Sequence, residues 1–222
     1  MCLSIGTRPD CLPDDVIDLL NRLNKIKPVW IELGLQTIHE DTATYINRGY
    51  TLNIFDDAVS KLNAIGVEVI VHLILGLPYE TESDILESVS YVCNKPISGI
   101  KLQLLHILKN TPLEKEYLLN KFHVFSLEEY ATLLGKCICT IPKNIVIHRI
   151  TGDGPKSLLI EPQWSGNKKL VLNLLINILM IWILSKVNTF NRKHLVCFFS
   201  SNLSAFYLYL SFCRSGICCL LY

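Results

Sequence analysis

Hydrophobic and polar residues alternate in blocks over the first 150 residues of this 222-residue chain. Short apolar runs rich in β-branched residues end in polar or glycine-containing sequence, and segments with apolar residues every three or four positions lie between them. The predicted strands cover residues 1–7, 30–35, 67–75, 100–105 and 144–150. The predicted helices begin near Pro13, Thr51, Glu82, Pro112 and Ser126. Strands joined by crossovers of helical length predict an α/β fold with a parallel sheet.

Local signals mark the ends of several predicted helices. Thr51 is expected to cap the second helix, and Gly66 is expected to end it in the left-handed conformation. Ser126 to Glu129 has the pattern of a capping box. The apolar stripe of the first helix includes Leu19 and Ile26, so we expect both side chains to face the sheet.

Polar side chains interrupt the apolar strands, or follow them closely, at Glu32, Gln36, Arg48 and His72. A strand that is buried on both faces has no favourable place for such groups. Functional side chains of parallel α/β proteins gather at the carboxyl ends of the strands, which favours a binding site here. The structural alternative is an ion pair between Glu32 and Arg48, with His72 as a hydrogen-bonded core residue.

Charge divides the chain into two parts. Up to Glu161 there are 15 Lys and Arg against 20 Asp and Glu, whereas the last 61 residues carry 6 basic and no acidic side chains. We therefore expect a core over residues 1–161, a closing helix region over 162–185 and an apolar tail over 186–222. The tail is interpreted as extraneous coding from a disrupted or frameshifted gene. The alternative is a membrane hairpin through residues 170–212, whose first uncharged run is short for a hydrocarbon core.

Nine cysteines stand at positions 2, 11, 93, 137, 139, 197, 213, 218 and 219, without the close spacing of a metal-binding cluster. Nothing in the sequence resembles a cleavable signal peptide, which argues against a disulfide framework. We therefore expect a cytoplasmic chain whose cysteines are reduced and which contributes no metal ligands.

Five motifs occur in a fixed order: IGTRPDCLPD, WIELGLQT followed by INRGY, HLILGLPYET, GIKLQLLHILKNTPL and IVIHRITGD. Together with the closing PQWSGNKK, they resemble the radical S-adenosylmethionine (radical SAM) enzymes, and most closely the YhcC-like group with a MiaB/NifB-type core. The resemblance covers about residues 3–178. It implies a partial (β/α) barrel with S-adenosylmethionine (SAM) across the carboxyl ends of its strands. In this family a reduced [4Fe-4S] cluster cleaves SAM to a 5′-deoxyadenosyl radical.

The resemblance implies that six residues bind the cofactor. Gln36 and Arg48 match positions that contact the sugar or the methionyl part of SAM, to which an amide and a guanidinium are suited. Glu32 is expected to assist with a charged amine, and His72 stands where many relatives carry an aspartate that contacts the nucleoside. The following strand end is expected to pack against the adenine. The six residues are Glu32, Gln36, Arg48, His72, Ile74 and Gly76.

Further polar residues are expected to face the substrate from the mouth of the barrel, and the alternative is that they form salt bridges there. An alternative role for Lys101 is that of the Schiff-base lysine of an aldolase-like barrel, but the full set of motifs favours the radical SAM interpretation. Gln103 shares the face of Lys101 by the period of two. The residues expected on the substrate side are Arg8, Asp10, Lys101, His106, His148 and Arg149.

The cluster-binding cysteines of the family lie on the loop after the first barrel strand, and this sequence begins beyond that point. We therefore expect a barrel without its first strands and a chain that is inactive alone. The predicted function is that of a fragment of a radical SAM enzyme, and the alternative is a non-catalytic α/β remnant or binding module. The intact enzymes take electrons from a reductant such as ferredoxin or flavodoxin. Some relatives modify tRNA, but no basic stripe in this chain independently indicates RNA, and a membrane partner is not expected.

Overall fold

The structure is a computed structural model that describes residues 2–120, 122–152 and 154–187. The predicted tail over residues 186–222 therefore lies outside the described residues, apart from its first two positions. The same holds for most of the alternative membrane hairpin. Within the described ranges, no helix is both long enough and apolar enough to cross a membrane.

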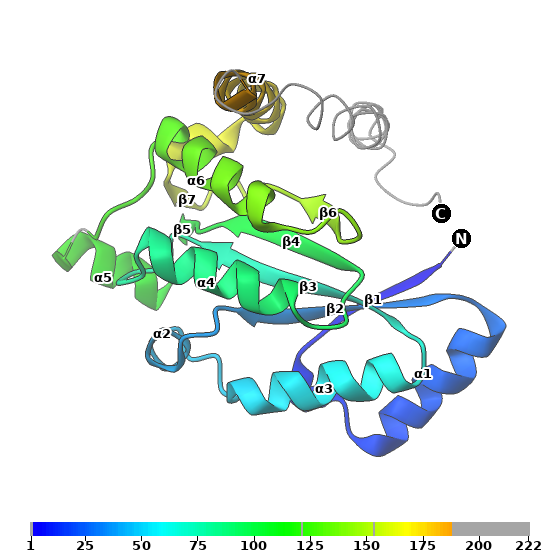
Figure 1. The fold of residues 1–222 in the computed structure, drawn as a ribbon. Coiled ribbons are helices and arrows are strands. Elements are labelled where there is room, and N and C mark those ends of the chain that lie inside the picture. The colour runs from blue at the N-terminus through cyan, green and yellow to red at the C-terminus, as the bar shows by residue number, and fades with distance from the viewer. Residues whose placement is uncertain (1, 121, 153, 188–222) are drawn as a thin grey trace.

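Five strands form the central sheet, and every neighbouring pair in it is parallel. In sheet order they are β1 (Leu3–Thr7), β2 (Val29–Gln36), β3 (Glu68–Leu75), β4 (Gly99–Leu104) and β6 (Val146–Arg149) (Figure 1). These strands confirm the predicted α/β fold with a parallel sheet. A second sheet pairs β5 (Ile107–Leu108) with β7 (Leu159–Glu161) in antiparallel orientation, and the sequence pattern did not predict it.

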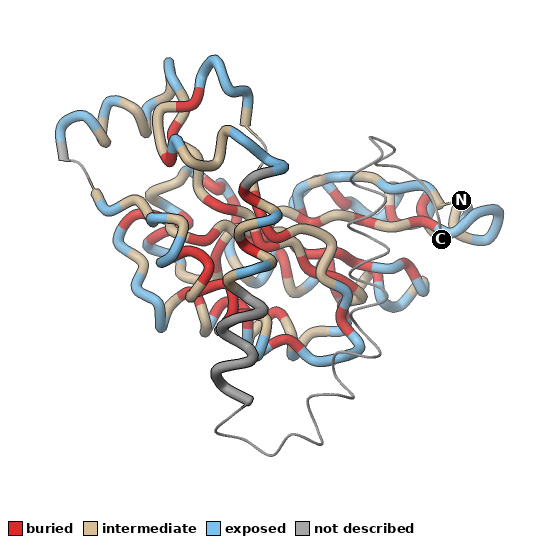
Figure 2. Tube along the Cα trace, turned by 90° about the horizontal axis from the view of Figure 1, so that it is seen from above, coloured by how far each residue is buried: buried red, intermediate tan, exposed pale blue. Residues whose placement is uncertain are grey.

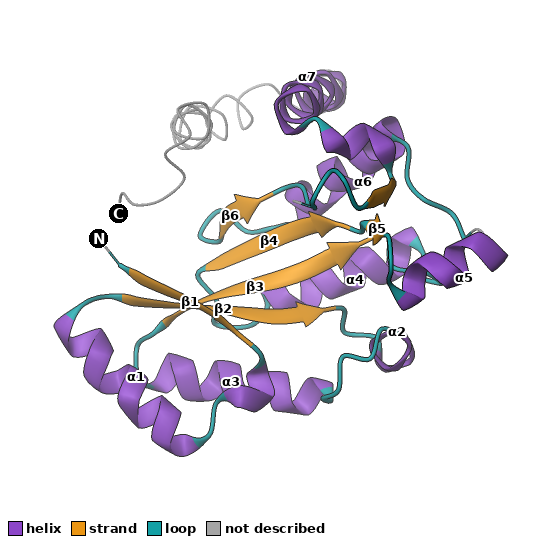
Figure 3. Ribbon diagram, turned by 180° about the vertical axis from the view of Figure 1, so that it is seen from behind, coloured by secondary structure: helices purple, strands orange, loops and turns teal. Residues whose placement is uncertain are grey.

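Among the described residues, helices cover one face of the sheet and leave the other face open (Figures 1 and 3). The helices on that face are α1 (Asp14–Ile26), α3 (Leu52–Ala64), α4 (Glu82–Cys93) and α6 (Leu127–Thr140). The other described α-helices are the short α2 (Glu40–Tyr45), α5 (Pro112–Asn120) beside β5, and α7 (Lys168–Val187) against α6. Two 3-10 turns lie at Pro9–Cys11 and Gln163–Gly166.

The hydrophobic core lies between the sheet and these helices. In β2 the residues Val29, Ile31, Leu33 and Leu35 are at most 1% exposed, whereas the alternate residues are only half-buried. Side chains on a strand point to opposite faces in turn, so the alternate residues belong to the open face. Figure 2 shows the buried residues gathered in the middle of the molecule.

Two of the predicted helix ends are confirmed. Gly66 follows α3 with φ +69°, the left-handed conformation that glycine adopts without a steric penalty. At the start of α6, Ser126 and Glu129 form both hydrogen bonds of a capping box.

One prediction about the helix ends is confirmed in position only, and one about the helix faces is wrong. Thr51 stands at the N-cap position of α3, but its side chain makes no capping hydrogen bond. Instead, Glu40 Oε1 accepts a hydrogen bond from the Leu52 N–H at 2.6 Å, because α2 brings this carboxylate to the end of α3. Leu19 and Ile26 are 44% and 83% exposed, since only part of the apolar stripe of α1 reaches the sheet.

Candidate functional site

The open face of the sheet carries the polar residues that the sequence singled out in the strands. Parallel register aligns Gly34 of β2 with His72 of β3, and His72 with Lys101 of β4. Aligned residues of neighbouring strands point to the same face of the sheet. Glu32 is two residues before Gly34 on β2, so its side chain also lies on the open face, beside those of His72 and Lys101. The period of two in the sequence is thus sufficient to place the three polar residues on one surface.

Four strands contribute to one hydrogen-bonded network on this face. Glu32 Oε2 accepts from Lys101 Nζ at 2.5 Å and lies 3.1 Å from His72 Nε2. Glu32 Oε1 accepts from Ser4 Oγ at 2.9 Å, and Gln103 Nε2 lies 3.1 Å from His72 Nδ1. We call these five side chains the inner-face network. The structural alternative of a Glu32–Arg48 ion pair is wrong, because Lys101 is the partner of Glu32.

The protonation states of the network follow from its geometry. Burial opposes the ionisation of Glu32, but the hydrogen bonds from Lys101 and Ser4 outweigh it and lower the pKa of this carboxyl. Burial, reinforced by the positive charge of Lys101, lowers the pKa of His72 to about 4. A neutral His72 beside an ionised Glu32 must donate from Nε2, and its Nδ1 then accepts from the Gln103 amide. Both ring nitrogens of His72 are therefore occupied within the chain.

The predicted substrate-side residues of β6 border this network. Arg149 is aligned with Lys101 across the sheet. The ring of His148 meets the Trp30 ring edge-on, with the centroids 5.6 Å apart, and it fills the space that a side chain on Gly99 would take. Burial, with the charge of Lys101, lowers the pKa of His148. This end of the open face therefore holds two cations and two neutral imidazoles near the carboxylate of Glu32.

His106 lies apart from the network, in the loop between β4 and β5. Its ring is cradled by two glycines of a later loop: a Cβ on Gly152 would lie 2.5 Å from Cε1, and a Cβ on Gly154 would lie 2.9 Å from Nδ1. Side chains at these two positions would displace the ring. The predicted substrate-side residues thus form two groups, His106 and the β4–β6 set.

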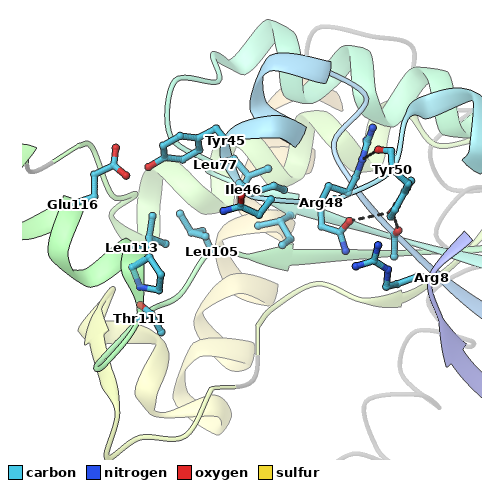
Figure 4. Close-up of a pocket in the computed structure, with 15 residues that line it drawn as sticks. Arg8, Tyr45, Ile46, Arg48, Tyr50, Leu77, Leu105, Thr111, Leu113 and Glu116 are labelled. Atoms are coloured by element: carbon cyan, nitrogen blue, oxygen red, sulfur yellow. Dashed lines mark hydrogen bonds between the residues drawn. The ribbon is translucent and has the colours of Figure 1, made fainter. Parts of the chain in front are cut away.

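A pocket with a volume of about 470 Å³ opens beyond the carboxyl ends of β2 and β3 (Figure 4). Arg8, Arg48 and Tyr50 line one end (Figure 4), and Gln36 lies beside Tyr50. Apolar side chains, including Ile74, are also part of the lining. The opposite end is formed by α2 and by the segment that leads into α5. A concave, largely apolar cavity with a few polar groups is the usual form of a small-molecule site.

A bulge in β2 shapes the polar end of this pocket. Gln36 has φ +67°, and the pairing register with β3 shifts between Gly34 and Gln36. The Gln36 side chain folds back over Gly34, where an added Cβ would lie 2.7 Å from Gln36 Nε2. The Tyr50 hydroxyl donates to the Gly34 carbonyl and lies 3.5 Å from Gln36 Oε1. Burial raises the pKa of Tyr50 to about 12, so this hydroxyl stays a donor at neutral pH.

Arg48 organises the loop behind the pocket. Its side chain is only 1% exposed, and the guanidinium donates to the Thr37 carbonyl at 2.7 Å, the Tyr50 carbonyl at 2.9 Å and Glu40 Oε2 at 3.1 Å. Its Cζ also lies 4.8 Å from the centre of the Tyr50 ring. A ligand carboxylate would have to share this guanidinium with three oxygens of the chain.

Arg8 presents a second guanidinium at the same end of the pocket, and its side chain is 51% exposed. Nε and Nη2 donate to the two carboxylate oxygens of Asp10 at 2.9 and 2.7 Å. The Arg8 Cζ lies 5.5 Å from the centre of the Tyr50 ring, so Arg8 and Arg48 both contact this ring. The alternative of a salt bridge at the barrel mouth therefore describes the Arg8–Asp10 pair.

One group of possible metal ligands occurs among the described residues: His39, Asp84 and Glu87, whose donor atoms lie within 4.8 Å of one another. The Asp84 carboxylate already accepts the Thr81 N–H in the capping box of α4 at 2.7 Å. The His39 Nε2 atom lies 2.9 Å from the Asp84 carbonyl oxygen. The group contains no thiol.

Family models match most of the chain. The model of the radical SAM superfamily matches residues 1–92, and the model of the Radical_SAM C-terminal domain matches residues 97–180. The chain belongs to the radical SAM superfamily. SAM and a [4Fe-4S] cluster are the cofactors of this superfamily.

Relatives and a solved structure agree with this assignment. The chain is 46% identical to YtqA of Bacillus subtilis over 170 residues, which cover 77% of this chain and 53% of YtqA. It is 36% identical to YhcC of Escherichia coli K12 over 167 residues, which cover 75% of this chain and 54% of YhcC. The chain thus spans about half the length of the curated relatives it matches.

The structure of Elp3 from the archaeon Methanocaldococcus infernus, with an N-terminal deletion, has the same fold. The TM-score is 0.67 at 21% identity, and the match covers 79% of this chain and 42% of that chain. The similarity confirms a radical SAM type of α/β fold.

For a radical SAM protein, the predicted residues fall into two neighbouring sets. The pocket contains Gln36, Arg48 and Ile74, whereas Glu32 and His72 belong to the inner-face network. Gly76, with φ +90°, ends β3 against Phe125, whose ring would lie 2.9 Å from an added Cβ. Their roles toward SAM or substrate stay predictions.

Sequence reasoning missed several residues of the pocket and of the network. Tyr45, Tyr50 and Glu116 line the pocket, and Ser4 completes the network. Tyr50 is the last residue of the INRGY motif and Tyr45 directly precedes it, so the motif itself could have pointed to both. The sequence around Glu116 did not indicate a binding residue, because carboxylates are common on solvent-exposed helices.

Proposed function

We propose that this chain provides the SAM-binding and substrate-facing part of a radical SAM enzyme. The supporting observation is the pocket at the carboxyl ends of β2 and β3, which is bordered by the inner-face network in a chain of this superfamily. In such an enzyme, reductive cleavage of SAM supplies a 5′-deoxyadenosyl radical that abstracts hydrogen from the substrate.

The pocket residues suit SAM. The Gln36 amide can both donate to and accept from ribose hydroxyls, and the Arg8 and Arg48 guanidiniums attract a carboxylate. Ile74 and Leu77 provide an apolar surface for a purine. These pocket residues would bind and orient the cofactor. Glu32 and its hydrogen-bond partners would keep the charges on the adjoining open face of the sheet in fixed positions.

The described thiols do not suit a [4Fe-4S] cluster. A cluster of this kind needs thiolates that converge on one point. Burial raises the pKa of Cys93 to about 11 and that of Cys137 to about 12, which disfavours their thiolate forms. The group of possible metal ligands among the described residues contains none of these cysteines.

Isothermal titration calorimetry of the full chain with SAM tests the proposal. We expect saturable binding, and we expect Gln36→Leu to weaken it about fivefold to tenfold, which is the contribution of about one hydrogen bond. Asn53→Leu replaces an exposed amide of α3, away from the pocket, and should leave the affinity unchanged. Equal weakening by both variants, or no binding at all, would contradict the proposal.

The second candidate function is that of a non-catalytic binding module, which the described thiols favour. Anaerobic reconstitution of the chain with iron and sulfide, followed by an assay for 5′-deoxyadenosine under dithionite, tests the premise that both candidates share, namely that these thiols hold no cluster. We expect SAM binding without a stoichiometric cluster. A stoichiometric cluster that forms 5′-deoxyadenosine would show that thiols interpreted as structural are ligands.

A further inference from the structure

The charged side chains that line the pocket are segregated along its length. Arg8 and Arg48 stand at one end, and the carboxylate of Glu116, from α5, stands at the other (Figure 4). Between them the wall is apolar and includes Leu77 and Leu105. A ligand that fills such a cavity is oriented by charge, with its anionic part toward the arginines and its cationic part toward Glu116.

Two tyrosines accompany the carboxylate. The rings of Tyr45 and Tyr79 meet edge-on at 83°, with the centroids 5.3 Å apart. Tyr79 Oη donates to Glu116 Oε1 at 3.2 Å. The Tyr45 hydroxyl is buried beside the same carboxylate, without a hydrogen bond of good geometry. A buried hydroxyl that lacks a well-placed partner at the wall of a pocket is a polar group that a ligand can satisfy.

The backbone at Tyr79 supports a functional reading of this end. Tyr79 has φ +69°, a conformation that is unfavourable for a bulky residue, yet its side chain is 72% exposed. Burial of the ring therefore does not compensate the strain. The strained backbone instead holds the ring against Tyr45 and Glu116, two residues that line the pocket. Backbone strain of this kind is often found at binding sites.

We infer that Tyr45, Tyr79 and Glu116 form a recognition site for a cationic group of the substrate, such as an ammonium. An anionic side chain beside aromatic faces attracts a cation both by its charge and by the ring quadrupoles. The inference rests on the proposed function, because it assigns the arginine end of the pocket to SAM and the Glu116 end to the substrate.

The test compares two probes of the same shape. Choline carries a quaternary ammonium, and 3,3-dimethylbutan-1-ol is its neutral isostere. Titrations of the full chain followed by NMR should give an affinity for choline about tenfold higher than for the alcohol. Glu116→Gln should remove most of this preference. Glu128→Gln makes the same charge change at an exposed position on α6 and should leave the preference intact.

A second variant keeps the result interpretable if the first one affects folding. Tyr79→Leu retains the carboxylate and removes one aromatic face, so it should reduce the preference for choline by about threefold. Equal binding of the two probes, or equal losses in Glu116→Gln and Glu128→Gln, would overturn the inference.

Calorimetry with SAM separates this inference from the proposed function. We expect Glu116→Gln to leave the SAM affinity unchanged. If SAM does not bind but choline is preferred, the proposed function fails and the cation site stands. If Glu116→Gln weakens SAM and choline alike, Glu116 belongs to the SAM site and the inference falls.

Discussion

The neutral state of His72 predicts a specific loss of stability in acid. His72 is 23% exposed, and its pKa in the folded protein is about 4, whereas an unfolded histidine has a pKa of about 6.5. Between these values the unfolded chain binds the proton and the folded chain does not. The contribution of His72 is therefore fully present above pH 6.5 and is lost as the pH falls toward 4.

The pKa difference sets the size of this effect at about 3 kcal/mol of unfolding free energy. His72→Gln removes the titration and keeps an amide that can donate to Glu32. As the pH falls from 7 toward 4, the wild type should lose about 3 kcal/mol of unfolding free energy relative to the variant. Urea unfolding followed by circular dichroism, at several pH values from 7 to 4, measures this change.

His123→Gln is the matched control, because His123 is exposed and its partner Glu129 is also on the surface. Its unfolding free energy should run parallel to that of the wild type. The reasoning would be refuted by parallel curves for His72→Gln and the wild type. It would equally be refuted if NMR titration of the His72 ring gave a midpoint near 6.5.

Three further substitutions test the packing around the site. Gly99→Ala should destabilise the fold by about 1–3 kcal/mol, because its Cβ would lie 2.5 Å from the His148 ring, whereas Gly6→Ala, with nothing within 4 Å, should be nearly neutral in thermal unfolding. Arg48→Ala should lower the unfolding free energy by about 2–5 kcal/mol, since two carbonyls lose their buried donor, and denaturant titration would show it. Gly34→Ala should weaken SAM binding, measured by calorimetry, but change the melting temperature only slightly. The reason is that the added Cβ displaces the flexible Gln36 side chain of the pocket.

The strand pattern accounts for most of what could be predicted. Apolar runs with β-branched residues placed the five parallel strands, and the period of two placed Glu32, His72 and Lys101 on one face. The partner of Glu32 did not follow from the pattern. Both Lys101 and Arg48 are cations that could have paired with Glu32. Only the register of β4 against β3 shows that Lys101 is the partner.

Other features depend on contacts that no local signal announces. Strands as short as β5, Ile107–Leu108, have no periodicity to detect. The left-handed conformations of Gln36 and Tyr79 arise from the surrounding structure, since neither residue type favours them. The contact between Tyr79 and Glu116 joins residues 37 positions apart, and it is fixed by where α5 docks.

The inner-face network also selects one alignment of the strands during folding. Ser4, Glu32, His72 and Lys101 come from four consecutive strands of the sheet, and each is held in place by another. A slip of β2 by one residue would turn Glu32 toward the apolar helix layer. An unpaired carboxylate there would cost several kcal/mol, about as much as many single domains have in total stability. The inner-face network therefore disfavours misaligned sheets that hydrophobic packing alone would tolerate.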